Sequence, residues 1–191
     1  MKRYLGENPD NANDYLKNPA GSKYNSGFSF AKETDVVPLI KTLIQKTQDS
    51  IIGNNREITL IIKPQRAVNR LRLFADKETQ FSKLIYNKQE SKPDSTETLY
   101  KKRRSNSLLS YYMSKGDSLV FTFAVPKGVT PDMSLREYSF DLLEHPSFDI
   151  TSRPNYTMPK PFVVNDAIII EKKINVDELA FAKVKNDTIN E

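Results

Sequence analysis

Residues 107–125, "SLLSYYMSKGDSLVFTFAV", are the stretch from which the fold class is best predicted. Two runs rich in apolar and aromatic residues, 107–113 and 118–125, stand on either side of the polar turn "SKGD". Gly116 and Asp117 suit the special backbone conformations of a tight turn. The stretch therefore predicts a β-hairpin.

Further segments extend the predicted sheet outward from this hairpin. Residues 57–63, "EITLIIK", are short and almost wholly apolar, which predicts a strand that is buried on both faces and ends at Pro64. Residues 162–174, "FVVNDAIIIEKKI", also have strand composition. The proline-rich residues 146–162 are expected to cross the surface without pairing as an inner strand.

Residues 66–88 allow two interpretations. In "NRLRLF", Arg70 and Arg72 alternate with Leu71 and Leu73, which is the period of a strand. We prefer a hairpin in which "ADKETQ" forms the loop and "FSKLIYN" the returning strand. A helix fits the spacing of the apolar residues as well, so the pattern leaves this choice open.

Three segments carry the periodicity or the end signals of helices. In residues 35–50, apolar side chains recur at three- and four-residue steps, and Gly53 follows. Residues 133–145, "MSLREYSFDLLEH", are also interpreted as a helix. The capping-box spacing of Asn175 and Glu178 predicts a short C-terminal helix.

Together these segments predict an α+β fold. We expect one sheet-dominated, mostly antiparallel domain with two to three helices and an extended N-terminal arm. The arm covers residues 1–33 and the domain residues 34–191, which include the proline-rich crossing 146–162 and the C-terminal helix. A chain of 191 residues without an internal repeat is most simply one domain.

The N-terminal arm contains a short repeated motif, in which Tyr-Leu is followed by Asn-Pro, two times within residues 4–19. An arm this polar cannot offset the entropy of ordering, about 1 to 2 kcal/mol per residue, by packing on itself. A partner surface is therefore expected, although two turns opened by Asn-Pro in a free tail explain the same residues. The anchors of the arm on its partner would be Tyr4, Leu5, Tyr15 and Leu16.

Charge is distributed unevenly along the chain. The formal charge is 0 for residues 1–35, +9 for residues 36–128 and −4 for residues 129–191, in agreement with the net charge of +5. This asymmetry fits a surface that faces nucleic acid, or complementary charge between neighbouring copies of one chain.

The most basic segment lies beside aromatic residues. Four consecutive cations follow Tyr100, and Tyr111 and Tyr112 come soon after them. Cations beside aromatic rings can bind a phosphate backbone and stack on bases, but a solvated loop or an acidic protein partner explains the run equally well. The predicted residues for binding nucleic acid or an acidic partner are Tyr100, Lys101, Lys102, Arg103, Arg104, Arg70 and Arg72.

The sequence offers little for catalysis. It contains one histidine, His145, no cysteine and no glycine-rich phosphate loop. On a helix, Glu137, Asp141 and His145 would share one face, which we interpret as a solvent face rather than a metal site. We therefore expect no catalytic residues, no cofactor and no metal.

These features favour a non-enzymatic structural subunit of a large assembly, with a component of a phage or virus particle as the specific case. Its expected partners are other copies of itself or neighbouring structural proteins, with non-specific nucleic acid as a further partner. No membrane is expected among the partners. No secretion signal is recognised, so we expect the protein in the cytoplasm of the producing cell or in a virion. The alternative is an accessory nucleic-acid-binding module that acts through residues 99–112.

Overall fold

The computed structural model describes residues 35–91, 103, 105–159 and 164–182, together with the backbone of two short strands before them. The chain divides into two units, one made of residues 1–39 and 139–168 and the other of residues 40–138 and 169–191. Within the described residues no helix occurs, so none is present that could cross a membrane.

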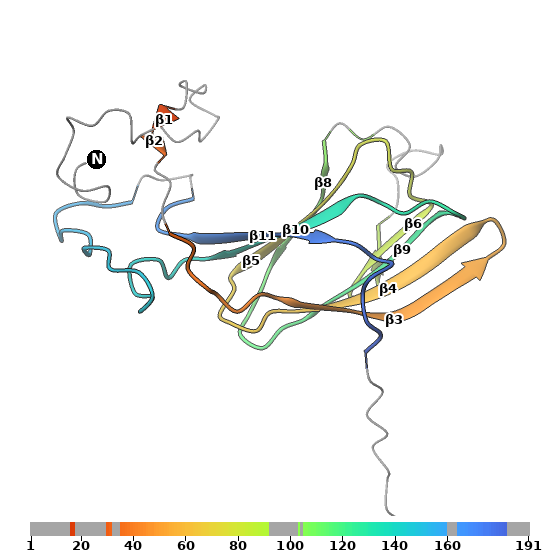
Figure 1. The fold of residues 1–191 in the computed structure, drawn as a ribbon, viewed down its shortest axis with the longest axis horizontal. Coiled ribbons are helices and arrows are strands. Elements are labelled where there is room, and N and C mark those ends of the chain that lie inside the picture. The colour runs from red at the N-terminus through yellow and green to blue at the C-terminus, as the bar shows by residue number, and fades with distance from the viewer. Residues whose placement is uncertain are drawn as a thin grey trace, which may run out of the picture. The chain divides into compact units, whose positions relative to one another are not determined.

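The larger unit is built from two antiparallel sheets (Figure 1). One sheet has the order β3-β4-β9-β6-β7 and the other the order β11-β10-β5-β8. The bounds of these strands are β3 Leu43–Ile52, β4 Asn55–Lys63, β5 Arg70–Ala75, β6 Lys83–Tyr86, β7 Gln89–Glu90, β8 Ser107–Tyr112, β9 Leu119–Pro126, β10 Met133–Ser139 and β11 Ile168–Ile174.

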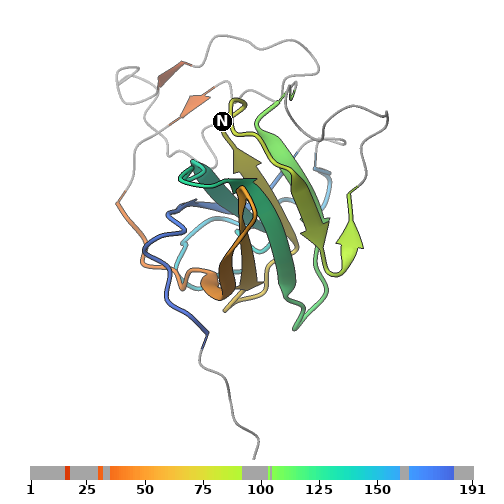
Figure 2. The same ribbon diagram turned by 90° about the vertical axis from the view of Figure 1, so that its right-hand side faces the viewer.

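One hydrophobic core joins the two sheets into a sandwich (Figure 2). In the first sheet the buried residues of β4 pair with those of β9, as Leu60 does with Phe121. In the second sheet Leu71 and Leu73 of β5 point into the same core, and Leu135 of β10 pairs with Leu73. Alternate side chains therefore face inward, which is the strand period of two.

The chain changes sheets at most of its connections. From β4 to β10, successive strands lie in opposite sheets, with the short β6–β7 hairpin as the exception. Several strands that pair are therefore far apart in sequence, as β4 and β9 are. Composition identifies such strands, but their partners depend on the packing of the whole core.

The predicted hairpin at residues 107–125 is half right. Both runs form strands, β8 and β9, and Gly116 adopts a positive φ of 87° in the turn between them. The two strands nevertheless lie in different sheets, because β8 pairs with β5 whereas β9 pairs with β4 and β6. The turn connects the two sheets instead of closing a hairpin.

For residues 66–88 the strand interpretation is confirmed and the hairpin is wrong. β5 and β6 belong to different sheets, so "ADKETQ" lies in a connection between sheets. Residues 57–63 form most of β4, but they are not buried on both faces. Ile58, Leu60 and Ile62 are buried, whereas the residues between them are only half-buried.

The helix predicted for residues 35–50 is wrong. Residues 43–52 form β3, which pairs with β4 through a turn in which Gly53 has a positive φ of 60°. Val36 and Ile40, which the helical stripe would have buried, are exposed. The period of two, with Ile44 and Lys46 facing inward, prevails because β4 offers a pairing partner.

The other two predicted helices are also wrong within the described residues. Residues 133–139 form β10, in which Met133, Leu135 and Glu137 face inward. Pairing of β10 with β5 along its whole length replaces the helical hydrogen bonds. Near the C-terminus, residues 175–178 form one turn, and the chain then continues as an extended segment beside β3. The sheet-dominated antiparallel part of the predicted α+β class is confirmed, and its α part is not.

The described residues of the smaller unit from 140 to 167 form turns and irregular segments. Residues 146–159 of the predicted proline-rich crossing form no strand, and the rest of that crossing lies outside the described residues. Arg153 forms an ion pair with Asp166 within this unit. Near the N-terminus, β1 (Leu16–Lys17) and β2 (Phe30–Ala31) pair antiparallel.

Candidate functional site

The outer face of the four-stranded sheet carries arginine and aromatic side chains in neighbouring strands. Arg70 pairs in register with Tyr112 of β8, and Arg72 pairs with Arg136 of β10. Phe74 follows on the same face of β5, two residues after Arg72. We call this set, Arg70, Arg72, Phe74, Tyr112 and Arg136, the arginine–aromatic face.

The arginines of this face pack on its rings. The guanidinium carbon of Arg70 lies 5.2 Å from the centroid of the Tyr112 ring. The guanidinium carbons of Arg72 and Arg136 lie 4.8 and 5.1 Å from the centroid of Phe74. These are cation–π distances, so the rings fix where the positive charges stand.

One carboxylate partly balances the positive charge. Nη2 of Arg136 lies 2.6 Å from a carboxylate oxygen of Glu171 on β11, and this hydrogen bond raises the pKa of Arg136. Arg70 donates through Nε to the Ser110 hydroxyl at 2.8 Å, which is a neutral partner. The face therefore keeps an excess of positive charge, which attracts anions.

The structure describes only part of the predicted basic site. Tyr100, Lys101, Lys102 and Arg104 lie outside the described residues. Arg103 donates to the main-chain carbonyls of Ala75, Ser105 and Asn106, at 3.1, 3.3 and 3.4 Å. Burial lowers the pKa of Arg103.

Arg70 and Arg72 do share one outer face, as their alternation predicted, and Tyr112 joins them. Tyr111 faces the other way, and its hydroxyl accepts a hydrogen bond from Asn87 at 3.0 Å. Sequence reasoning missed Arg136, because it assigned that residue to a helix. The roles proposed for Arg70, Arg72 and Arg103 in binding stay predictions.

A second surface lies along the outer edge of β3, where a segment near the C-terminus is attached. The Lys46 amide donates to the Ala180 carbonyl at 2.9 Å, and the Ala182 amide donates to the Lys46 carbonyl at 2.7 Å. The Lys46 ammonium also lies 4.9 Å from the centroid of the Phe181 ring. Residues 180–182 thus run parallel to β3 at this point.

Ion pairs reinforce this attachment. Arg56 donates to both carboxylate oxygens of Asp49 at 2.8 Å, and it lies 2.7 Å from a carboxylate oxygen of Asp177. Lys46 reaches Asp49 as well, at 3.1 Å. We call Lys46, Asp49, Arg56 and Asp177 the edge network. It connects β3, β4 and the turn before residues 180–182.

The edge network shifts the pKa values of its carboxyl groups. The hydrogen bonds from Arg56 lower the pKa of Asp49 to about 2. The Thr130 hydroxyl and then Arg56 lower the pKa of Asp177. Hydrogen bonding to Asp49 raises the pKa of Arg56. All three groups therefore stay charged at neutral pH.

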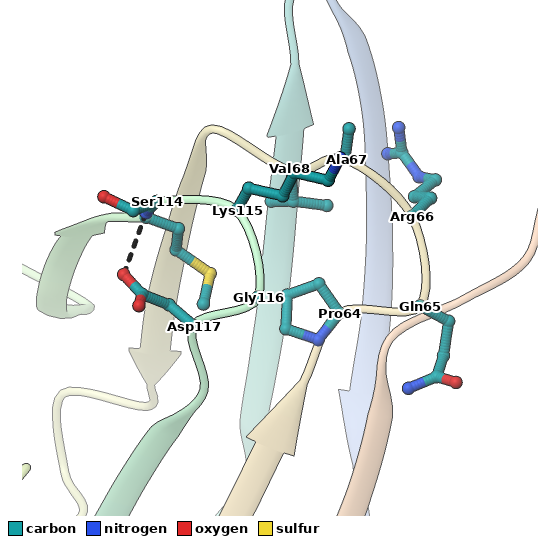
Figure 3. A pocket seen from close by; sticks show the side chains of 10 residues that line it. Pro64, Gln65, Arg66, Ala67, Val68, Ser114, Lys115, Gly116 and Asp117 are labelled. Atoms are coloured by element: carbon teal, nitrogen blue, oxygen red, sulfur yellow. Dashed lines mark hydrogen bonds between the residues drawn. The ribbon is translucent and has the colours of Figure 1, made fainter.

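A third feature is a cavity of about 350 Å³ between residues 64–68 and residues 113–117 (Figure 3). The Ser114 amide donates to the Asp117 carboxylate at 2.9 Å and holds one of the two loops. Arg66, on the other loop, lies 3.3 Å from the buried Glu137 carboxylate. No local pattern of residues predicts this cavity, because loops from distant parts of the chain form it.

The predicted anchors of the N-terminal arm cannot be placed on any of these surfaces. Tyr4, Leu5 and Tyr15 lie outside the described residues, and of Leu16 only the backbone is described, in β1. Within the described parts of the chain, no group of three or more histidine, aspartate or glutamate residues is arranged to hold a metal.

Comparisons with protein families, curated proteins and solved structures found no match to this chain.

The edge network predicts a specific acid sensitivity. The pKa of Asp49 is lower in the folded protein than the 3.8 of an unperturbed group, so its carboxylate stabilises the fold above about pH 4. This contribution is lost as the pH falls toward 2, and it amounts to at most about 2 kcal/mol for a partly solvated pair. Urea unfolding of Asp49→Asn should therefore show lower stability than the parent at pH 7 and a smaller difference near pH 2.

Asp132→Asn, which removes an exposed carboxyl group outside the network, is the control. Its difference in stability from the parent should not shrink in this way between pH 7 and pH 2. If the difference in stability between Asp49→Asn and the parent stays constant from pH 7 to pH 2, the stabilising role assigned to the Asp49 carboxylate is contradicted.

Proposed function

We propose that this protein is a non-enzymatic structural subunit of a large assembly, with a component of a phage or virus particle as the specific case. The observation that carries the proposal is the exposure of apolar side chains on an edge strand. Leu43, Ile51 and Ile52 of β3 are 42%, 52% and 56% exposed. An edge strand with exposed apolar side chains is a ready template for pairing with another chain.

β3 also carries features that limit uncontrolled pairing. Lys46 faces inward as a buried cation, and the register shifts between Lys46 and Gln48 as in a β-bulge. Both are known devices of edge strands. The described pairing along the outer edge is at Lys46, within the first half of the strand, whereas Ile51 and Ile52 stand at its C-terminal end. These features therefore protect only part of the β3 edge from pairing. The rest of the edge stays available for a specific contact with a neighbouring subunit.

The N-terminal arm is the second proposed contact. Its formal charge is 0 through residue 35, whereas an arm that packages nucleic acid would be basic. We therefore assign residues 1–33 to protein contacts, with Tyr4 and Leu5 and then Tyr15 and Leu16 as anchors. Partners are other copies of this chain or neighbouring structural proteins.

The arm proposal predicts that assembly depends on the two Tyr-Leu pairs. Deleting residues 2–30 should leave a cooperatively folding domain that no longer assembles, because the sandwich core lies entirely after residue 43. The alanine variant at Tyr4, Leu5, Tyr15 and Leu16 should behave in the same way. Light scattering measures the mass of the assembly, and urea unfolding reports the fold.

Tyr24→Ala with Phe28→Ala is the matched control, since it removes aromatic rings from the same arm outside the repeated motif. Assembly that survives the deletion of residues 2–30 would exclude the arm as a contact.

The edge proposal predicts that charge at the open end of β3 blocks assembly. Ile51→Lys with Ile52→Lys should lower the mass measured by light scattering while the unfolding transition is kept, because both side chains are exposed in the single chain. Val129→Lys, at another exposed apolar position of the same unit, should leave the mass unchanged. If both variants assemble as the parent does, the edge of β3 is not a contact.

A further inference from the structure

We propose that the arginine–aromatic face binds single-stranded nucleic acid without sequence preference. This function is separate from the assembly proposed above. It assigns the outer face of the four-stranded sheet as the binding surface, and it adds Arg136, Phe74 and Tyr112 to the arginines that sequence reasoning had proposed.

The charge of the face is the first argument. Arg70 and Arg72 stand two residues apart on β5, about 7 Å, and Arg136 pairs in register with Arg72. Among the described residues, the ion pair recorded for these three guanidinium groups is that of Arg136 with Glu171. A row of cations of this kind can follow a phosphate backbone, and guanidinium groups form bidentate hydrogen bonds with phosphates.

The exposed ring is the second argument. Tyr112 is 69% exposed, although it stands beside Arg70 in the sheet. A ring held open among cations can stack on a base, and stacking tolerates every base because each has a π-face. Phe74 is less exposed and serves differently, since it holds the guanidinium groups of Arg72 and Arg136 in place from within the face.

The shape of the surface favours a single strand over a duplex. The face consists of strand residues of β5, β8 and β10, and the described chain contains no helix that could enter a major groove. Sheet surfaces with aromatic side chains bind splayed bases of single strands in this manner. One member of the basic run, Arg103, contacts the carbonyl of Ala75, directly after Phe74. Arg103 therefore contacts the same sheet at the end of β5.

The experiment uses the full chain and a fluorescein-labelled oligothymidylate longer than about 16 nucleotides, followed by anisotropy over a range of salt concentrations. Three phosphate contacts predict that the logarithm of the binding constant falls with the logarithm of salt at a slope of about −2. Arg70→Ala with Arg72→Ala should make this slope less steep by about 1.4. The variant Arg70→Lys with Arg72→Lys keeps both charges and should keep the slope.

Matched controls distinguish binding by the arginine–aromatic face from attraction by the overall positive charge of the protein. Lys63→Ala with Lys127→Ala removes two cations from β4 and the turn after β9, and should leave the slope unchanged. Tyr112→Ala should weaken binding about tenfold, since one stacked base is lost. Tyr156→Ala removes an exposed ring of the smaller unit and should have no effect. Because Tyr112 is exposed, its variant is expected to fold even if the double arginine variant does not.

Several results would overturn the proposal. The first two are the absence of binding at low salt, and a change of the salt slope in Lys63→Ala with Lys127→Ala as large as that in Arg70→Ala with Arg72→Ala. The other two are an unchanged affinity of Tyr112→Ala, and tighter binding of a duplex than of a single strand. If the arginine variant lowers the mass in light scattering but leaves oligonucleotide binding intact, the face contacts an acidic protein instead.

Discussion

The structure depends on one constraint, which is that two sheets must bury their inner side chains in a single core. Leu60 and Phe121 from one sheet and Leu73 and Leu135 from the other belong to the same buried cluster. The chain meets this constraint by passing from sheet to sheet at nearly every connection after β4. Because the apolar side chains are used inside, the chemistry available for binding lies on the outer faces and at the edges of the sheets.

The two proposed surfaces lie on the parts of the sandwich that its core does not bury, which are the edges and the outer faces of the sheets. An antiparallel sheet that is not closed into a barrel has edges, and β3 protects one end of its edge with Lys46, the edge network and residues 180–182. The outer face of the other sheet is free for polar side chains, and there β5 places Arg70 and Arg72 between the rings of Tyr112 and Phe74. The basic middle of the chain is thus partly gathered on one face, whereas Asp177 of the acidic end serves the edge network.

Local pattern predicted most of the strands, but it assigned β3 and β10 to helices and it predicted the pairing of the strands poorly. The alternation at residues 70–73 correctly placed Arg70 and Arg72 on one face, because strand period is a local property. The pairing of β8 with β5 instead of β9 is set by core packing between distant segments, which no local pattern encodes. The helical spacing at residues 35–50 was misleading because β4 offered that segment a pairing partner. The same type of error, at residues 133–145, hid Arg136, one of the three arginines of the arginine–aromatic face.

The separation of β8 and β9 into different sheets is the claim on which the arginine–aromatic face depends, since it places Tyr112 beside Arg70. Nuclear Overhauser contacts between backbone protons of the full chain test it most directly. The structure predicts contacts of β8 with β5, such as Ser110 with Arg72, and of β9 with β4, such as Phe121 with Leu60. A ladder of contacts between β8 and β9 themselves, as in a hairpin, would contradict the account.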